Sequence, residues 1–329
     1  MKDMIKVSII VKGIEDDSTI KRQTPKGDGV WGRCKFTLNE FDDLDYAIVL
    51  NYLYKDLNVP NRNCVWLFIQ EPYQKGIYDW VLEGHAQYSR VFTHQIPFFS
   101  DPAEYILTPP LIGWFLNCSY SDLKMMREVP EKTKSMSCIS STKSMFPGHK
   151  ARTEFVQDIM RNRKTPEIDF FGKGMNYIED KGKALFPYKY TISIENESKR
   201  DYWTEKVSDA YLAYCVPFYY GCTNLSNYFP KDSFISIDIS DPENSIEIIN
   251  SVLSDSNDYF SRLPSIIKAR EMVLERYNFL AYISGKVTDH YDLQNFSGKK
   301  TENKYQFKKY VPSFRSKMRS SSGKLTRRW

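Results

Sequence analysis

Short apolar runs, each ended by glycine, asparagine or proline, recur along the chain and constrain its fold more than any other feature. In the first third such runs cover residues 4–13, 46–53 and 64–72, and shorter ones follow at 90–95 and 104–110. Runs rich in β-branched and aromatic residues are typical of strands, and a nearly continuous apolar character is typical of strands buried on both faces. The first third therefore predicts a largely parallel sheet.

The rest of the chain alternates expected strands with expected helices. The strands are predicted at 137–141, 167–174, 188–194, 217–221 and 234–239. The helices are predicted at 150–163, from a cap at Thr204 up to Pro217, at 245–254 and at 261–283. Such alternation favours right-handed crossovers and a second parallel sheet. The pattern thus predicts an α/β protein with two domains.

The length of 329 residues also suits two domains of about 150 residues each. Between Ser121 and Ser135 the chain becomes polar and charged, which is typical of a linker. We therefore expect an N-terminal α/β domain at 1–125, a linker at 126–136, a second α/β domain at 137–285 and a basic extension at 286–329.

The net charge of +5 is distributed unevenly. From Lys299 to Trp329 there are eleven Lys and Arg residues and one acid, Glu302, so this segment carries +10 and the preceding residues carry −5. A mildly acidic body argues against a nucleic-acid partner. Aromatic residues interleave the basic ones, which suits contact with an anionic membrane surface, where each Lys or Arg contributes about 1 kcal/mol. A tail that is solvated or packed on the body is an equal alternative.

Other features narrow the class of protein. The start of the chain leads directly into the strand-like run 7–11, and no run approaches the roughly 20 apolar residues of a membrane helix. The six cysteines show no zinc-ligand spacing, so we expect reduced thiols and no metal. There is no G-x-x-x-x-G-K-[ST] and no G-x-G-x-x-G motif, which argues against a P-loop or a dinucleotide site. These features favour a cytoplasmic protein.

One expected helix begins with a lysine that its position disfavours. In YWTEKVSDAYLAYCVPFYYG (202–221), Thr204 is a candidate N-cap and Lys206 lies in the first turn, where the helix dipole disfavours a cation. A diphosphate bound at this helix start, beyond the strand that ends near Asn196, would accept helix N–H groups and pair with Lys206. The alternative is a capped surface helix whose Glu205 and Lys206 face water.

Two further segments offer chemistry. FPGHKARTEF (146–155) gathers His149, Lys150 and Arg152 at another helix start, where arginine suits phosphate oxygens. A solvated basic turn is the alternative. Glu71 follows the expected strand at 64–70, where a carboxylate can act as a general base beside a ligand. An exposed turn residue is the simpler interpretation of Glu71.

Residues 188–235 strongly resemble the donor-binding domain of the α-1,3/4-fucosyltransferase family. The family run has a Tyr-Lys/Arg-Phe/Tyr strand, Phe-Glu-Asn, Tyr-x-Thr-Glu-Lys, a helix, Val-Pro-x-x-x-Gly, Phe-x-Pro and Ser-Phe-Ile. Its counterparts here are Tyr188–Tyr190, Glu195–Asn196, Tyr202–Lys206, Val216–Pro217 with Gly221, Phe229–Pro230 and Ser233–Ile235. Ile194 replaces the first Phe.

Upstream, residues 168–172 match the family's Val-Asp-x-x-Gly, and Arg152 fits its phosphate-binding arginine. In the N-terminal half, VWLFIQEP (65–72) resembles the family's Glu-Ser-Pro region, although the serine is missing. No counterpart of the membrane anchor and stem of the animal Golgi members is present. The resemblance is therefore to a bacterial-type enzyme.

The resemblance implies two Rossmann-like domains facing a cleft, a GT-B type glycosyltransferase that uses GDP-β-L-fucose and inverts the anomeric centre. Glu71 would be the general base, and Arg152 and Lys206 would neutralise the departing GDP without an obligatory metal. Asn196 and Tyr202 would position the diphosphate, and Glu205 would bind the ribose hydroxyls.

The acceptor would be a glycan or glycolipid, in lipopolysaccharide or glycan biosynthesis, with the protein peripheral on the inner face of the membrane. Two alternatives remain open. The same fold and site can use another nucleotide sugar, because phosphate contacts do not identify the sugar. A non-catalytic glycan-binding module is the other.

Overall fold

The computed structural model describes residues 4–14, 16–39, 41, 43–59, 61–96, 104–142, 146–296 and 305–311. The chain divides into two compact units. The first comprises Met1–Pro110, Ser119–Ser121 and Phe279–Trp329, and the second comprises Leu111–Cys118 and Asp122–Asn278. Residues 279–285, expected in the C-terminal domain, therefore lie in the first unit, and 111–118 and 122–125, expected in the N-terminal domain, lie in the second.

The first unit is built on a seven-stranded sheet with the order β2-β3-β1-β4-β6-β7-β8. Its strands are β1 (Ile5–Ile10), β2 (Val30–Trp31), β3 (Cys34–Thr37), β4 (Tyr46–Leu50), β6 (Val65–Phe68), β7 (Arg90–Thr93) and β8 (Glu104–Leu107). All neighbours are parallel except β2 and β3. The parallel sheet predicted from the apolar runs is confirmed, whereas the short strands β2 and β3 were not predicted.

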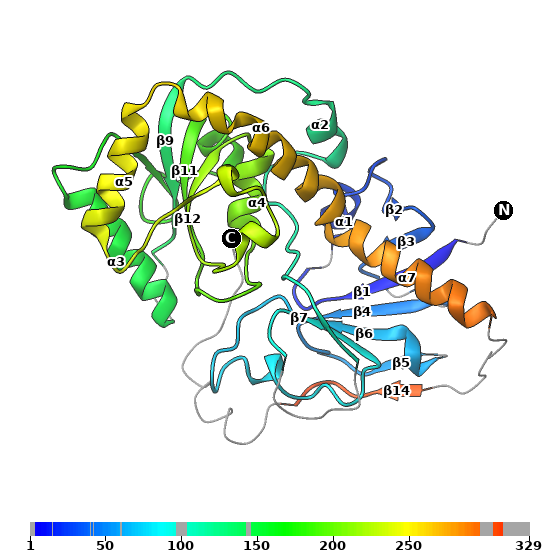
Figure 1. Ribbon diagram of the computed structural model, residues 1–329. Coiled ribbons are helices and arrows are strands. Elements are labelled where there is room, and N and C mark those ends of the chain that lie inside the picture. Colours follow the sequence, from blue (N-terminus) through cyan, green and yellow to red (C-terminus); the bar gives the residue numbers. More distant parts are fainter. Residues whose placement is uncertain are drawn as a thin grey trace. The chain divides into compact units, whose positions relative to one another are not determined.

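The connections within this unit contain little helix. In the residues that the structure describes, their helical parts are α1 (Ser18–Lys21) and two 3₁₀ turns, Arg62–Cys64 and Asp79–Val81. The long helix α7 (Phe279–Phe296) from the other end of the chain packs on the sheet instead (Figure 1). The Phe279 ring meets Phe68 edge-on at 5.1 Å, and Ser284 Oγ donates to the carbonyl of Trp31 at 2.7 Å. A helix far along the chain thus covers strands that the local connections do not cover.

The last described residues also belong to the first unit. Strand β14 (Tyr305–Phe307) pairs antiparallel with β5 (Leu57–Val59), and Phe307 is buried in the core. The Tyr310 hydroxyl donates to Glu83 at 2.6 Å. Packing on the body, one alternative for the basic extension, therefore holds for 305–311. Residues 297–304 and 312–329, with most of the basic residues, lie outside the described part, so membrane contact stays a prediction for them.

The second unit contains a five-stranded, wholly parallel sheet with the order β10-β9-β11-β12-β13. Its strands are β9 (Lys134–Ile139), β10 (Asp169–Phe171), β11 (Tyr188–Ile194), β12 (Val216–Tyr220) and β13 (Ile235–Ser236). All five were predicted, although β9 begins inside the expected linker. On one face of the sheet the Ser137 and Thr191 hydroxyls of β9 and β11 are hydrogen-bonded at 3.1 Å and buried. Tyr190 and Ile192, which point to the opposite face of β11, are also buried, so protein covers both faces of the sheet.

Helices lie on both sides of this sheet. They are α3 (Pro147–Arg161), α4 (Glu205–Leu212), α5 (Pro242–Ser254) and α6 (Asp258–Glu271), with 3₁₀ turns at Lys181–Ala184, Leu225–Asn227 and Lys231–Ser233. The short helix α2 (Tyr120–Met125) precedes β9. Figure 1 shows α3 and α5 on one side of the sheet and α4 with α6 on the other. Right-handed crossovers produce this result, because the chain leaves β9 and β11 in opposite directions along the sheet.

The single helix expected at 261–283 is wrong. Helix α6 ends at Glu271, a π-helical turn follows at Met272–Arg276, and α7 starts at Phe279. The Tyr277 N–H bonds to the Met272 carbonyl, and its ring packs at 5.3 Å from both Trp203 and Phe229. This aromatic packing fixes the break at the point where the chain leaves the second unit. No helix in the described ranges combines the length and apolar character needed to span a bilayer.

Candidate donor site

The second sheet has its topological switch point between β9 and β11, and the predicted donor residues follow these two strands. Strand β10 lies on one side of β9, whereas β12 lies beyond β11 on the other. In open α/β sheets ligands bind outside the carboxyl ends of the strands at such a point. Arg152 lies on α3, which follows β9, and Asn196 and Lys206 follow β11. The fold thus brings predicted phosphate ligands together.

Arg152 and Asn196 are in direct contact. Arg152 Nη1 donates to Asn196 Oδ1 at 2.5 Å, and Nη2 donates to Ser141 Oγ at 3.2 Å. A Cβ on Gly148, at the start of α3, would lie only 1.6 Å from the carbonyl oxygen of Asn196. Glycine at this position therefore allows the helix start to pack on the loop after β11. Burial lowers the pKa of Arg152 from its usual high value, and Arg152 stays a cation.

Helix α4 begins as predicted, with Thr204 as its N-cap. The Thr204 hydroxyl accepts from the Lys206 backbone N–H at 3.5 Å and from Lys206 Nζ at 3.0 Å. Lys206 Nζ also contacts Glu195 Oε2 at 3.1 Å and Glu205 Oε1 at 3.5 Å. In this structure the negative partners of the lysine are therefore two carboxylates, whereas the sequence had predicted a bound diphosphate as its partner.

Ionic contacts continue along the same face of α4. Lys181 lies 4.0 Å from Glu205 and 2.9 Å from Asp209, one helical turn further on. The other oxygen of Asp209 accepts the backbone N–H of Phe115 at 3.0 Å. The site thus alternates cations and carboxylates, an arrangement that satisfies charges that are largely buried.

The protonation states follow from this arrangement. Although burial opposes the charged form, the charges of Glu195 and Glu205 raise the pKa of Lys206. Burial also opposes the charge of Glu205, but Lys206 and Lys181 lower its pKa. Lys206 is consequently a cation and Glu205 an anion near neutral pH. The ionised Glu205 can accept hydrogen bonds from two adjacent hydroxyl groups of a bound ligand.

Hydrogen bonds within a buried polar cluster hold the loop between β11 and α4 in place. Asp201 has a left-handed backbone (φ 61°), and its carboxylate accepts from Asn224 at 2.7 Å and from the Tyr228 hydroxyl at 2.6 Å. The next residue, Tyr202, is 2% exposed, and Trp203 is also buried. The predicted diphosphate contact of Tyr202 stays a prediction, since its side chain is almost wholly covered.

Glu71 lies in the first unit, in the segment that follows β6. The residue before it, Gln70, donates its backbone N–H to Asn51 Oδ1 at 2.8 Å, and Glu71 itself is partly buried. Its role as a general base stays a prediction. The other predicted site residues, Arg152, Asn196, Tyr202, Glu205 and Lys206, all lie in the second unit.

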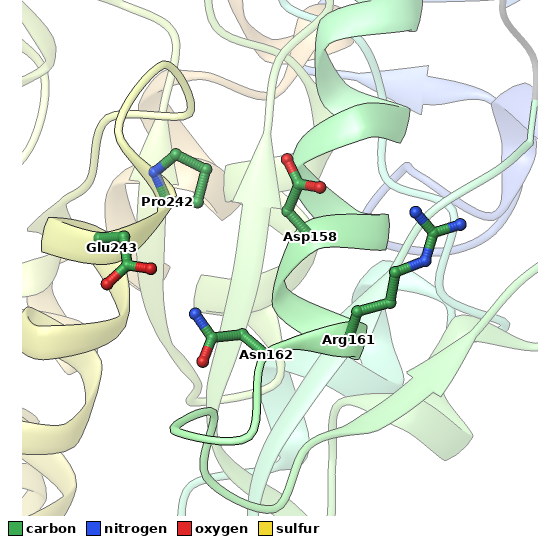
Figure 2. A pocket seen from close by; sticks show the side chains of 5 residues that line it. All are labelled: Asp158, Arg161, Asn162, Pro242 and Glu243. Carbon is green, nitrogen blue, oxygen red and sulfur yellow. The ribbon is translucent and has the colours of Figure 1, made fainter.

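The cavity drawn in Figure 2 is a separate feature of the second unit. It is lined by Asp158, Arg161 and Asn162 at the end of α3 and by Pro242 and Glu243 at the start of α5. None of the six predicted site residues lines it. Among the described residues, no group of three or more His, Cys, Asp or Glu side chains is arranged to hold a metal ion.

Three charged residues of this network, Glu195, Lys181 and Asp209, were not among the predicted site residues. Glu195 was quoted within the matched motif but was given no role. Asp209 is one turn after Glu205 on α4, so its helical spacing could have placed it on the same face. Lys181 precedes β11 in a 3₁₀ turn, and no local pattern indicates its contact with α4.

Comparisons with known proteins confirm the resemblance for this unit. Residues 129–263 match the model of glycosyltransferase family 10 (fucosyltransferase), C-terminal region. The mouse 4-galactosyl-N-acetylglucosaminide 3-alpha-L-fucosyltransferase 9 is 32% identical over 140 residues, which cover 41% of this chain and 37% of the mouse protein. The Helicobacter pylori alpha-(1,3)-fucosyltransferase FucT is 29% identical over 87 residues, 26% of this chain and 18% of that protein.

A solved structure shares the fold over most of the chain. It is described as the crystal structure of alpha1,3-fucosyltransferase, and it covers 80% of this chain and 81% of its own, with a TM-score of 0.51 and 16% identity. The expected fold class, α/β with parallel sheets in Rossmann-like units of the GT-B type, is confirmed.

Proposed function

We propose that this chain, whose residues 129–263 match the family 10 fucosyltransferases, moves L-fucose from GDP-β-L-fucose to a glycan hydroxyl with inversion, giving an α-1,3 linkage. The observation that carries the proposal is the contact pattern at the switch point of the second sheet. Two buried or partly buried cations, Arg152 and Lys206, meet the loop after β11 and the start of α4 there. Cations and a helix start both favour a bound diphosphate, and here they occur together.

The proposed reaction is a single displacement. Glu71 takes the proton of the acceptor hydroxyl. The oxygen of that hydroxyl attacks the anomeric carbon of fucose from the face opposite to GDP. The bond from that carbon to the β-phosphate oxygen breaks, and both bonding electrons leave with GDP. Since the β-linked donor is attacked from the opposite face, the product is the α-anomer.

The chain's own cations carry the leaving-group chemistry in this proposal. Arg152 and Lys206 neutralise the charge that develops on the β-phosphate, so no metal is included. Removing one such preorganised group typically costs a factor of about 10²–10³ in rate. Asn196 and Tyr202 position the diphosphate. Glu205, held ionised by Lys206 and Lys181, accepts hydrogen bonds from the ribose hydroxyls.

A different donor is the second candidate, because a diphosphate site serves any nucleoside diphosphate sugar. A glycan-binding module without activity is disfavoured by the Arg152–Asn196 contact and the Glu195–Lys206 contact, which hold the two proposed phosphate-binding cations in place.

The proposed acceptor is a glycan or glycolipid. Membrane contact through the basic residues after 311 belongs to the same proposal and predicts that deleting them weakens sedimentation with anionic vesicles.

Calorimetric titration with GDP-fucose, GDP-mannose, UDP-galactose and GDP tests the donor. We expect GDP and GDP-fucose to bind and Lys206→Ala to abolish the signal while the protein stays folded. Preferential binding of UDP-galactose or GDP-mannose would overturn the choice of donor. Absence of binding by all four ligands would contradict a donor site in this unit.

A further inference from the structure

We propose that Glu195 is a positioning residue of the donor site and holds the Lys206 ammonium at the place where the diphosphate binds. The inference rests on the proposed function and extends it to a residue with no assigned role. It does not require Glu195 to touch the donor.

The Glu195 carboxylate is fully covered by protein and makes three polar contacts. Its side chain is 0% exposed. Oε1 accepts the backbone N–H of Thr204 at 2.7 Å, and Oε2 accepts the Thr204 hydroxyl at 2.7 Å and Lys206 Nζ at 3.1 Å. A single carboxylate therefore fixes both the cap of α4 and the cation in its first turn.

The geometry leaves one position on Lys206 for a ligand. An ammonium group has three N–H donors. The two shorter contacts of Lys206 go to the Thr204 hydroxyl at 3.0 Å and to Glu195 at 3.1 Å, and the contact with Glu205 is longer, at 3.5 Å. The Lys206 side chain is also 22% exposed, so a ligand can reach it. A phosphate oxygen can replace the longest contact while Glu195 keeps the ammonium in place.

Glu195 is itself held firmly. Its backbone N–H bonds to the Tyr220 carbonyl at 2.8 Å. A Cβ on Gly221 would approach Glu195 Cγ to 2.4 Å, so the side chain packs directly against the glycine that ends β12. The next residue, Asn196, holds Arg152 at 2.5 Å. Consecutive residues after β11 thus set the positions of both phosphate-binding cations.

Glu195→Gln is the informative variant because it keeps the shape and removes the charge. The Thr204 N–H requires an oxygen at Oε1, so the new NH₂ group must face the Lys206 ammonium, donor against donor. Glu197→Gln is the control on the same loop, since Glu197 pairs with a different lysine, Lys199, at 2.5 Å; its side chain is 24% exposed, whereas that of Glu195 is 0% exposed. Gly221→Ala is a second variant that displaces Glu195 and keeps its charge.

The first measurement needs no ligand. Brief acetylation of the full-length protein, followed by mass spectrometry, reports how readily each lysine amine reacts. Since the ion pair holds Lys206 protonated, we expect its labelling to be slow in the wild type and about 10-fold faster in Glu195→Gln. In Glu197→Gln the labelling of Lys199 should change and that of Lys206 should not.

The second measurement compares GDP with guanosine. Loss of a charge-assisted contact at the diphosphate should raise the Kd of GDP about 10-fold in Glu195→Gln. The Kd of guanosine, which lacks the diphosphate, should stay unchanged, whereas general damage to the site would weaken both ligands. Gly221→Ala should shift the same two measurements in the same direction.

Unchanged Lys206 labelling in both Glu195→Gln and Gly221→Ala would overturn the inference, as would an equal or lower Kd of GDP in Glu195→Gln. A lower Kd would mean that Glu195 competes with the phosphate for Lys206. If wild-type protein binds no GDP, the proposed function fails, and the labelling still decides whether Glu195 holds Lys206.

Discussion

The two units of this protein contain sheets of similar kind but gather their parts from the chain in opposite ways. In the second unit, the residues that organise the candidate donor site lie mostly between Glu195 and Asp209, next to the strand and helix that position them. In the first unit, β4 and β6 are completed by α7, and β5 is completed by β14, from more than 200 residues later in the chain.

The site of the second unit therefore depends mainly on local contacts, whereas the stability of the first unit depends on contacts between distant parts of the chain. A site whose residues lie mostly in one segment, here joined by Arg152 and Lys181 from earlier in the same unit, can keep a recognisable motif, and the family match covers residues 129–263. A sheet finished by the chain's end requires long-range contacts for its stability. Substitutions should therefore act on ligand chemistry in the second unit and on folding in the first.

The largest effect is expected for Phe307→Ala in β14. Phe307 is 3% exposed within the core of the first unit, and truncating such a phenylalanine costs about 3–5 kcal/mol. Denaturant unfolding followed by hydrogen exchange should show loss of protection in the first unit. The matched control is Phe260→Ala on α6, because Phe260 is 57% exposed and should change stability by less than about 0.5 kcal/mol. Equal losses in the two variants would contradict the comparison.

Lys206→Ala should have the next largest effect, on catalysis. Transfer from GDP-fucose should fall by a factor of about 10²–10³, because a preorganised cation at the leaving group is lost. Circular dichroism should show a folded protein. Lys199→Ala removes a nearby lysine whose partner is Glu197, and its turnover should stay near that of the wild type. Normal turnover in folded Lys206→Ala would remove this residue from the mechanism.

Acid should weaken the first unit through His290 of α7. Burial, with a contribution from Arg90, lowers the pKa of His290 to about 4, and Nδ1 lies 2.7 Å from the Tyr46 hydroxyl. The unfolded chain, with a pKa of about 6.5, binds the proton first, so stability falls as pH drops from about 6.5 to about 4. A shift of this size corresponds to about 3 kcal/mol, and because His290 is only half-buried we expect a loss of about 2 kcal/mol, measured by urea unfolding at several pH values. A His290→Gln variant with the same acid dependence would contradict this origin.

The smallest effect is expected for Gly285→Ala in α7. A Cβ there meets no atom within 4 Å, and alanine favours a helix over glycine, so the first unit should gain about 0.5–1 kcal/mol. Gly13→Ala is the control of opposite sign, since Gly13 also has open space but a φ of 82°. Thermal unfolding should show a higher transition for the first variant and a lower one for the second.

Local sequence patterns predicted the features that depend on residues close together in the chain, namely the strands and the start of a helix. The apolar runs gave the parallel strands, Thr204 was recognised as a cap, and Arg152 and Asn196 meet at 2.5 Å as a shared site requires. The break of the helix at 261–283 depends on the packing of Tyr277 against Trp203 and Phe229, which no run of residues reveals. The pairing of β14 with β5 and the contact of Lys181 with Asp209 likewise depend on tertiary structure.

A crystal structure of the protein with GDP-fucose bound would show whether the start of α4 holds the donor. We expect the diphosphate to lie at the start of α4, in contact with Arg152 and Lys206, with Glu195 still bound to the lysine. A diphosphate bound elsewhere, or touching neither cation, would contradict this expectation.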